Sequence, residues 1–282
     1  MTLKIFIHDV GHGHSIHAFT PNDQSIVIDL GCSDDFSPLD WLKKSTSTID
    51  SLVVTHPHGD HIEEILKLKE FKVKQFWRPK WLSEDDVRKA NQNRYSEKLD
   101  YYFDISNNRF TQRIEKDELV GNPDVSAGVT IKTYASSDCG TSNINNHSGV
   151  VVFEYCGVKV VIPGDNEIPS WKSLLEQPDF VKAVDGAHIF LASHHGRESA
   201  YHSDLFKTIR PKLCVVSDGR VQDTDATSRY SAHASGWPVN DKANGESTER
   251  NCLTTRTDGY VEIEIRKNES ENGKPYLSVS KS

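Results

Sequence analysis

Residues 53–65 read VVTHPHGDHIEEI and place three histidines and an aspartate within six positions, between an apolar run and a segment with helical spacing. In an extended chain, residues two apart point the same way, so the imidazoles of His56 and His58 can bind one metal ion. Asp60 and His61 begin the following turn and face a position a few ångströms away, which suits a second ion. A solvated histidine-rich loop is the alternative, but four ligand-type side chains at a strand-to-helix corner favour a two-metal hydrolase.

Composition limits the class of protein. The chain has 282 residues and is 36% hydrophobic, so we expect one α/β domain over residues 1–267. No stretch approaches the roughly 18 apolar residues that span a bilayer, and the N-terminus lacks a cleavage pattern, so we expect a cytoplasmic protein without membrane contact. Five scattered cysteines without a CxxC pair indicate neither a disulfide framework nor a thiolate zinc site. A net charge of −8 argues against indiscriminate DNA coating, although a local basic patch is compatible with it.

Hydrophobic periodicity predicts alternating strands and helices. Strands are expected at 3–10, 25–31, 50–54, 128–135, 188–193, 212–219 and 259–267, with a hairpin over 148–165 that turns at Cys156 and Gly157. Helices are expected at 36–44, 61–71 and 171–184. The mixed-charge stretch 82–119 predicts an inserted helical arm, and the polar stretch 220–250 predicts a long loop beside the active site. The tail, 268–282, either adds a short strand or stays loose.

The HxHxDH motif after an apolar strand resembles the metallo-β-lactamase superfamily. This resemblance implies an αββα four-layer sandwich with a dinuclear metal site at one edge of two sheets, here with a helical insertion. HDVGHGHSIHA and SIVIDLG are similar to the opening strands of the hydrolase domain of competence DNA-uptake proteins, of which this chain resembles a stand-alone form. The segments NNHSGVVVFEYCGVKVVIPGD, FLASHHG, RPKLCVVSDG and TTRTDGYVEI follow in the same order as in that subfamily.

The resemblance also implies roles for three residues beyond the motif. Asp165 in IPGD matches the carboxylate that bridges the two ions. His194 and His195 match the HHG corner, where one histidine binds the second ion and the other hydrogen-bonds substrate or a leaving group. His194 directly follows the strand and is preferred as the ligand.

The third ligand of the first ion is less clear from the motifs. Many members of the superfamily use a histidine there, whereas the competence type carries an NxxS pattern, matched here by Asn145 and Ser148. His147 lies between them and is either the missing histidine ligand or a surface residue.

Two further residues are expected near the site. Asp9 should orient a metal ligand, since metal-bound imidazoles usually donate their other N–H to a carboxylate or carbonyl. His233, in a stretch that resembles the tyrosine-histidine loop of the family, is expected to act as an acid or a phosphate contact, together with Asp60 and His195 as catalytic groups. His12 and His14 replace other residues of the family motif and are either accessory substrate groups or without a role.

The ligand set predicts the chemistry. Nitrogen and oxygen ligands without thiolate suit two divalent ions, Zn²⁺ or Mn²⁺. Water shared by such ions becomes acidic enough to supply hydroxide near neutral pH, and that hydroxide can attack phosphorus or a carbonyl carbon.

Three functions follow. The first is a phosphodiesterase or nuclease. Basic side chains interleaved with aromatic rings suit single-stranded DNA, and the stretch contains Lys67, Lys69, Lys72, Lys74, Phe76, Trp77, Arg78, Lys80 and Trp81. Lysines that merely solvate a helix and an edge strand are the alternative.

The second function is a hydrolase of a small phosphoester, of the phosphorylcholine type, or of a lactone or lactam. The third is a partner-activated or non-catalytic module, with the aromatic residues of the arm as a docking surface: Tyr95, Tyr101, Tyr102 and Phe103.

Overall fold

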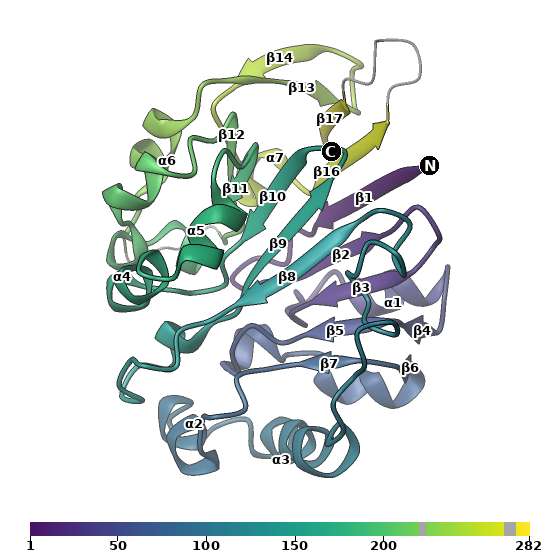
Figure 1. Ribbon diagram of the computed structural model, residues 1–282, viewed down its shortest axis with the longest axis vertical. Helices are drawn as coiled ribbons and strands as arrows, with labels where there is room; N and C mark the ends of the chain where they lie inside the picture. The colour runs from purple at the N-terminus through teal and green to yellow at the C-terminus, as the bar shows by residue number, and fades with distance from the viewer. Residues whose placement is uncertain (220–223, 268–274) are drawn as a thin grey trace.

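Two facing β-sheets form the centre of the protein, and helices cover the outer face of each sheet (Figure 1). A computed structural model describes residues 1–219, 224–267 and 275–282. Within these residues the first sheet has nine strands, in the order β14 (Ser247–Arg250), β13 (Trp237–Asp241), β17 (Pro275–Lys281), β16 (Val261–Lys267), β1 (Thr2–Ile7), β2 (Ile16–Phe19), β3 (Ser25–Ile28), β5 (Ser51–Val53) and β7 (Phe76–Trp77). The predicted αββα sandwich is confirmed.

The second sheet contributes the other half of the core. In the described part of the chain it has six strands, in the order β15 (Cys252–Thr254), β12 (Leu213–Val216), β11 (Ile189–Leu191), β10 (Val158–Ile162), β9 (Val150–Tyr155) and β8 (Thr130–Tyr134). A short separate pair joins β4 (Thr48–Ile49) to β6 (Lys72–Val73). The turn between β9 and β10 places Cys156 and Gly157 at φ 51° and 81°, as a two-residue hairpin turn requires.

The alternation along β1 explains the layering. Leu3, Ile5 and Ile7 are fully buried between the sheets, whereas Phe6 lies on the opposite face, with its ring 5.1 Å from that of Trp41. Trp41 belongs to α1 (Pro38–Lys43), which begins where the Ser37 hydroxyl accepts a hydrogen bond from Asp40 N. Because the outer face of β1 also carries an apolar ring, that of Phe6, this part of the sheet needs a helical cover.

The remaining helices cover the two outer faces. The six-stranded sheet is packed by α4 (Ile168–Leu175), α5 (Pro178–Val184) and α6 (Thr227–His233), through a cluster that includes Trp171, Phe180 and Tyr230. The nine-stranded sheet is packed by α1 and α3 (Ser96–Asp104), while α2 (Glu84–Ala90) precedes α3 and α7 (Thr255–Asp258) precedes β16. None of the helices within the described ranges has both the length and the apolar character needed to cross a bilayer.

Four predicted elements differ in the structure. Residues 61–71 were predicted as one helix but form two short 3₁₀ segments, Gly59–His61 and Ile65–Glu70, because the metal-binding motif takes up the first turn. The predicted helix 171–184 is split into α4 and α5, since Pro178 cannot continue a helix and restricts the residue before it.

The predicted loop 220–250 is the third difference. Its described part contains α6 and the β13–β14 hairpin, whereas residues 220–223 lie outside the described residues. The hairpin is at the sheet edge and buries Val239 alone among the residues of its two strands, so it lacks the apolar alternation by which strands are recognised. In the tail, Pro275–Lys281 forms β17 between β16 and β13, and residues 268–274 are outside the described residues.

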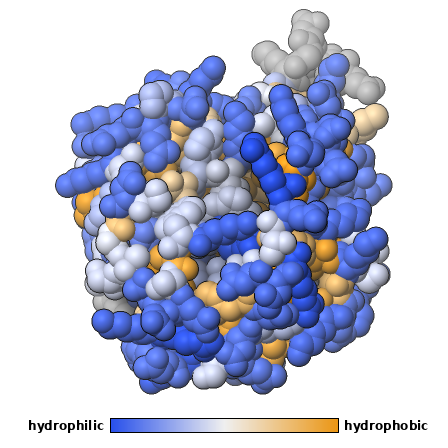
Figure 2. Space-filling model, turned by 60° about the horizontal axis from the view of Figure 1, so that its bottom comes forward, coloured by the Kyte–Doolittle hydropathy of each residue, from blue (hydrophilic) through white to orange (hydrophobic). Residues whose placement is uncertain are grey.

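The arm predicted over 82–119 is helical only in its first part. It contains α2, α3 and a π-helical turn, Ile105–Arg109, and residues 110–119 are not helical. Tyr101 and Tyr102 are buried against the core and Phe103 is half-buried. The face of the molecule that comes forward from the bottom of Figure 1, where the arm lies, is mostly hydrophilic, with small separate hydrophobic areas (Figure 2). The aromatic residues of the arm therefore mainly attach it to its own domain.

Two buried histidines, His8 and His17, pack against Trp41, and their burial predicts that the fold is sensitive to acid. Burial lowers the pKa of His8 from 6.5 to about 4. The unfolded chain therefore binds a proton that the folded chain rejects, so the free energy of unfolding falls as the pH drops from 6.5 towards about 4, by up to about 3 kcal/mol. We expect the His8→Phe variant to lose this part of the pH dependence in urea unfolding. Parallel curves for the variant and the wild type would contradict the assignment.

Candidate metal centre

The predicted ligand residues follow the ends of strands that meet at one edge of the sandwich. The segment Thr55–His61 follows β5, which runs parallel to β3, and Asp29 follows β3. Asp165 follows β10, and the His194–His195 pair follows β11, which runs parallel to both β10 and β12. Because parallel strands present their carboxyl ends together, residues far apart in the sequence are brought to one place.

The HxH pair converges as the motif requires. His56 Nε2 lies 2.9 Å from His58 Nδ1, and the His56 ring is fully buried. Ligand atoms that bind a tetrahedral zinc ion at 2.0–2.1 Å are about 3.3 Å apart, so these two nitrogens are close to the separation that a shared ion imposes. This pair is the first group of ligand atoms.

Asp165 connects the first group to a second one. Its Oδ2 atom lies 3.8 Å from His56 Nε2 and 3.7 Å from His195 Nε2, while its Oδ1 atom lies 3.3 Å from His61 Nε2. The carboxylate is 4% exposed, so water competes little for these positions. A buried carboxylate with imidazoles on both sides is suited to be shared by two cations.

The second group is formed by Asp60, His61, Asp165 and His195, whose ligand atoms all lie within 4.8 Å of one another. Asp60 Oδ2 is 3.3 Å from His195 Nε2 and 3.7 Å from His61 Nε2. The Nε2 atoms of His61 and His195 are buried and have no hydrogen-bond partner among the described residues. Buried polar atoms are rarely left unpaired, so their convergence fits a bound cation.

The structure distinguishes the two histidines of the HHG corner. His195, rather than the preferred His194, joins the second group, and its Nδ1 donates to the carbonyl oxygen of Ser217 at 2.9 Å, which leaves Nε2 free for a ligand role. His194 is not part of the second group: its Nε2 lies 3.8 Å from Asp165 Oδ2 and its Nδ1 3.0 Å from Glu167 Oε1. Both histidines have left-handed backbones, at φ 49° and 54°, which gives the adjacent side chains different partners.

Two histidines are available as the third ligand of the first group. His194 is the one that contacts Asp165. His147 is fully buried, with Nδ1 2.9 Å from Trp81 Nε1 and 3.1 Å from the carbonyl oxygen of Ser136. Its Nε2 is buried without a partner among the described residues, as are those of His61 and His195.

A carboxylate that the sequence reasoning missed orients the ligands. Asp29 is fully buried, and its Oδ2 accepts hydrogen bonds of 2.8 Å from the Nδ1 atoms of His61 and His14. The backbone N–H of Thr55 donates to Asp29 Oδ1 at 2.7 Å. Since His61 donates through Nδ1, its Nε2 is directed at Asp60 and Asp165. The signal in the sequence is an aspartate directly after an apolar strand, SIVID, whose neighbouring strand carries the histidine motif.

Other contacts fix Asp165 and His194. The hydroxyl of Ser148 accepts a hydrogen bond of 3.1 Å from Asp165 N, so Ser148 positions the shared carboxylate. Glu167 lies beside His194 and also accepts a hydrogen bond from Asn145 Nδ2 at 3.4 Å. The structure thus brings Asn145 and Ser148 next to the ligand residues.

The electrostatics of the cluster favour a cation. Burial alone would raise the pKa of Asp165, but His61, His195 and His194 outweigh it and hold that pKa well below its usual value. Burial would lower the pKa of His61, but the charges of Asp165, Asp29 and Asp60 raise it well above its usual value. Imidazoles with raised pKa values hold protons that a divalent ion must displace, so metal affinity should weaken as the pH falls.

The sequence matches the metallo-beta-lactamase superfamily over residues 10–212. The chain belongs to this superfamily. Similar solved structures include a putative Zn-dependent hydrolase of the superfamily from Thermotoga maritima, at 14% identity and a TM-score of 0.44, covering 89% of this chain and 97% of that one. They also include the metallo-beta-lactamase fold protein YhfI from Bacillus subtilis, at 12% identity and a TM-score of 0.49, covering 93% and 100%.

A third similar structure is Zn²⁺-bound PqqB from Methylobacterium extorquens, at 11% identity and a TM-score of 0.47, covering 92% of this chain and 98% of that one. A comparison with curated protein sequences gave no match. Membership of the metallo-β-lactamase superfamily makes the chain a metal-dependent hydrolase by family, with a His/Asp cluster able to bind metal. The finer resemblance to the competence proteins stays a prediction.

Two residues predicted at this metallo-β-lactamase site lie elsewhere. Asp9 is exposed and accepts a hydrogen bond from Gly11 N. The orienting role predicted for Asp9 is taken by Asp29. His233, at the end of α6, stacks on Phe206 with ring centroids 4.1 Å apart and bonds to the Tyr201 hydroxyl at 2.6 Å. Sequence spacing could not show that α6 covers the outer face of the second sheet.

His12, for which the sequence left the role open, lies at the border of the metal centre. Its half-exposed ring lies between Asp60 Oδ2, 3.8 Å from Nε2, and Asp218 Oδ1, 3.9 Å from Nδ1. The buried side chain of Asp218 is also 3.5 Å from Arg256.

The helical arm forms one wall of a cleft over the ligand residues. The cleft has a volume of about 230 Å³ and is lined on one side by His12, His58 and Asp60 and on the other by the turn between α2 and α3. Asn91 in this turn accepts a hydrogen bond from Gly59 N at 3.0 Å and donates to the carbonyl oxygen of Pro57 at 2.9 Å. The arm is therefore attached directly to the metal-binding motif.

The turn itself is strained. Gln92, Asn93 and Tyr95 all have left-handed backbones, at φ 54°, 57° and 60°, although none of them is glycine. Such conformations cost about 1 kcal/mol or more each and concentrate at functional sites. The Tyr95 ring lies against Gly59, where a Cβ atom would overlap it.

The basic stretch predicted to bind DNA does not form one exposed groove. Arg78 is 5% exposed and donates to Ser106 Oγ at 2.8 Å, and Trp77 packs against the core between the sheets. Lys67 and Lys74 pair with Asp40 and Asp50 at 2.7 and 2.6 Å. These contacts leave the set without a continuous surface of basic groups and stacking rings.

Proposed function

We propose that this chain hydrolyses a small phosphodiester with two divalent ions, Zn²⁺ or Mn²⁺. The observation that carries the proposal is the buried Asp165 carboxylate, whose oxygens lie within 3.8 Å of the Nε2 atoms of four histidines: His56, His61, His194 and His195. His56 and His58 would hold one ion, Asp60, His61 and His195 the other, and Asp165 both. When bound, two such ions activate water and neutralise the charge that develops on phosphoryl oxygens.

The residues of the chain prepare this chemistry. Asp29 and the carbonyl oxygen of Ser217 fix the imidazoles of His61 and His195 so that Nε2 faces the centre. The Ser148 hydroxyl holds Asp165 in place by accepting a hydrogen bond from the backbone N–H of Asp165. His12 borders the cleft with a half-exposed imidazole, where it can donate a hydrogen bond to a substrate oxygen.

The cleft supports a phosphodiester of modest size. The arm closes one side of it, and Arg94 lines that side without a carboxylate partner in the described part of the chain. A guanidinium among the residues that line the cleft favours an anionic phosphoryl group over a neutral lactone or lactam. The dispersed basic stretch supports a small substrate rather than a long single strand.

The test uses protein stripped of metal and reloaded with Zn²⁺ or Mn²⁺. We expect cleavage of a chromogenic phosphodiester, with little activity on single-stranded, linear or circular DNA and on lactones. DNA cleavage that matches the chromogenic substrate would overturn the small-substrate part. Silence on all phosphodiesters, with the ions bound, would overturn the proposal.

The third ligand of the first ion can be assigned by metal analysis. The two variants are His147→Ala and His194→Ala. The one that removes the true ligand should bind about one ion per chain less than the wild type, because too few protein ligands then remain to hold the first ion. Equal metal content in both variants and the wild type would contradict a third histidine ligand.

Arg94→Ala should raise KM for the phosphodiester about tenfold and change kcat less, since the lost contact is to a non-reacting phosphoryl oxygen. Arg113→Ala, which removes a guanidinium from the non-helical end of the arm, is the matched control and should match the wild type. A fall in kcat at constant KM would contradict a role of Arg94 in substrate binding.

A further inference from the structure

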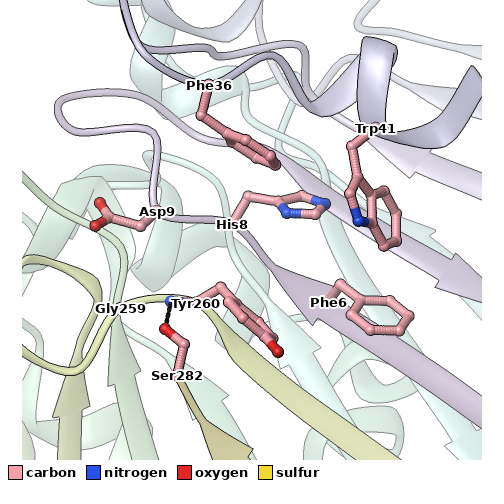
Figure 3. A pocket seen from close by; sticks show the side chains of 8 residues that line it. All are labelled: Phe6, His8, Asp9, Phe36, Trp41, Gly259, Tyr260 and Ser282. Atoms are coloured by element: carbon pink, nitrogen blue, oxygen red, sulfur yellow. Dashed lines mark hydrogen bonds between the residues drawn. The ribbon is translucent and has the colours of Figure 1, made fainter. Parts of the chain in front are cut away.

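A second cavity lies on the outer face of the nine-stranded sheet, apart from the ligand residues. It has a volume of about 390 Å³ and is lined by Phe6, His8, Asp9, Phe36, Trp41, Gly259, Tyr260 and Ser282 (Figure 3). These residues come from β1 and the segment that follows it, from α1 and the segment before it, from the two residues before β16, and from Ser282 after β17. None of them belongs to the metal centre.

Aromatic rings form most of the wall. Phe36 and Trp41 lie 5.4 and 5.0 Å from the His8 ring, and Phe6 lies 5.1 Å from Trp41. Tyr260 closes the side opposite Phe36 (Figure 3). The Tyr260 ring already attracts one ammonium group, that of Lys242, at 5.1 Å from the ring centroid. Rings arranged in this way offer several negative faces to one ligand.

The charged groups around the cavity are acidic. Asp9 lines it, is exposed and has no ion-pair partner in residues 1–219, 224–267 and 275–282. Asp34 and Asp35, both exposed, directly precede Phe36 but line a separate cleft, so Asp9 carries the charge of this wall. Lys242 contacts both Tyr260 and Glu262, so its charge is already compensated. The local charge therefore favours a cationic ligand and disfavours an anionic one.

His8 adds an uncommitted polar group to the wall. The residue is 3% exposed, and its Nε2 has no hydrogen-bond partner among the described residues. Burial lowers the pKa of His8 to about 4, so the ring carries no positive charge at neutral pH and does not repel a cation.

We propose that this cavity binds a small organic cation with a methylated ammonium group. Aromatic faces attract such a group, whereas a hard cation such as Ca²⁺ or Mg²⁺ needs several oxygen ligands, and Asp9 is the one carboxylate side chain among the residues that line the cavity. Asp9 lies at the edge of the aromatic wall with its carboxylate directed away from the rings, so it supplies a negative charge near a bound cation without contacting it (Figure 3).

Choline and its neutral isostere, the alcohol in which carbon replaces the quaternary nitrogen, are the probes. Their size and shape match, so only the charge distinguishes them. We expect calorimetric titration of the full chain to show about tenfold tighter binding of choline, in line with a partly desolvated cation over aromatic rings. Equal affinity for the two probes, or no binding of either, would overturn the proposal.

A variant pair locates the binding. Asp9→Asn should weaken choline binding about threefold to tenfold and leave binding of the neutral alcohol unchanged. Asp117→Asn removes one negative charge from the exposed end of the arm and should change neither. Unchanged metal content and thermal unfolding of Asp9→Asn check that the fold is intact. Equal effects of the two variants would overturn the assignment to this cavity.

Discussion

Replacement of Asp165 by asparagine is expected to abolish stable metal loading and to lower kcat/KM for a phosphodiester by on the order of 10³-fold. Both carboxylate oxygens face imidazole nitrogens, at 3.3 Å from His61 and 3.7 Å from His195. Asparagine keeps the volume but removes the negative charge and replaces one ligand oxygen with an amide nitrogen, which cannot bind a cation. Elemental analysis and steady-state kinetics after reloading measure the two effects.

Asp204→Asn is the matched control for this experiment. Asp204 is 54% exposed and pairs with Lys207 on the surface, so its replacement should alter neither metal content nor rate. Asp60→Ala should behave like Asp165→Asn, because Asp60 faces the same second group. Normal metal content in both variants would show that the cluster is not the metal site.

Asp29→Asn is expected to weaken metal binding by roughly 10-fold to 100-fold, although Asp29 is not placed as a ligand. One oxygen, Oδ2, accepts hydrogen bonds from His14 and His61, and the other accepts from Thr55 N. An amide cannot accept at both positions, so the His61 ring loses its fixed orientation. The buried contacts should also cost about 3 kcal/mol of unfolding free energy in the metal-free protein. Metal titration and urea unfolding measure these effects separately.

Asp9→Asn provides the comparison for Asp29→Asn. The family resemblance predicts an orienting role for Asp9, whereas the structure places this residue at the surface, outside the ligand contacts. We therefore expect wild-type metal affinity and stability for Asp9→Asn. Loss of affinity in Asp9→Asn, with none in Asp29→Asn, would reverse the assignment.

The HxHxDH motif predicted the centre because its geometry is local. His56 and His58 converge since residues two apart in an extended segment share a side, and that requires no knowledge of the rest of the chain. Asp165 was predicted from family motifs that place it after the end of a strand, and the structure brings it to both groups. The sandwich followed from strands with strong apolar patterns, such as β1, β9 and β10.

What was missed depends on side-chain direction and on distant contacts. His194 and His195 are neighbours in sequence, and their left-handed backbones, which decide the side that each ring faces, leave no mark in the pattern. Asp29 resembles an ordinary aspartate at a strand end until β3 and β5 are known to be parallel neighbours. The β13–β14 hairpin was predicted as loop because its polar edge position removes the alternation that marks buried strands.

The attachment of Asn91 to the backbone of Gly59 and Pro57 bears on how such an enzyme can diversify. An insertion is often regarded as a module that can be removed or exchanged, but deletion of this one would leave Gly59 N without its acceptor and disturb the histidine motif. Its exposed tip, Gln92 to Arg94, makes no such contact through its side chains in the described residues. With the substrate-binding role proposed for Arg94, mutations at the tip would change which substrate is accepted while the catalytic centre stays the same, so selection could act on specificity and chemistry independently.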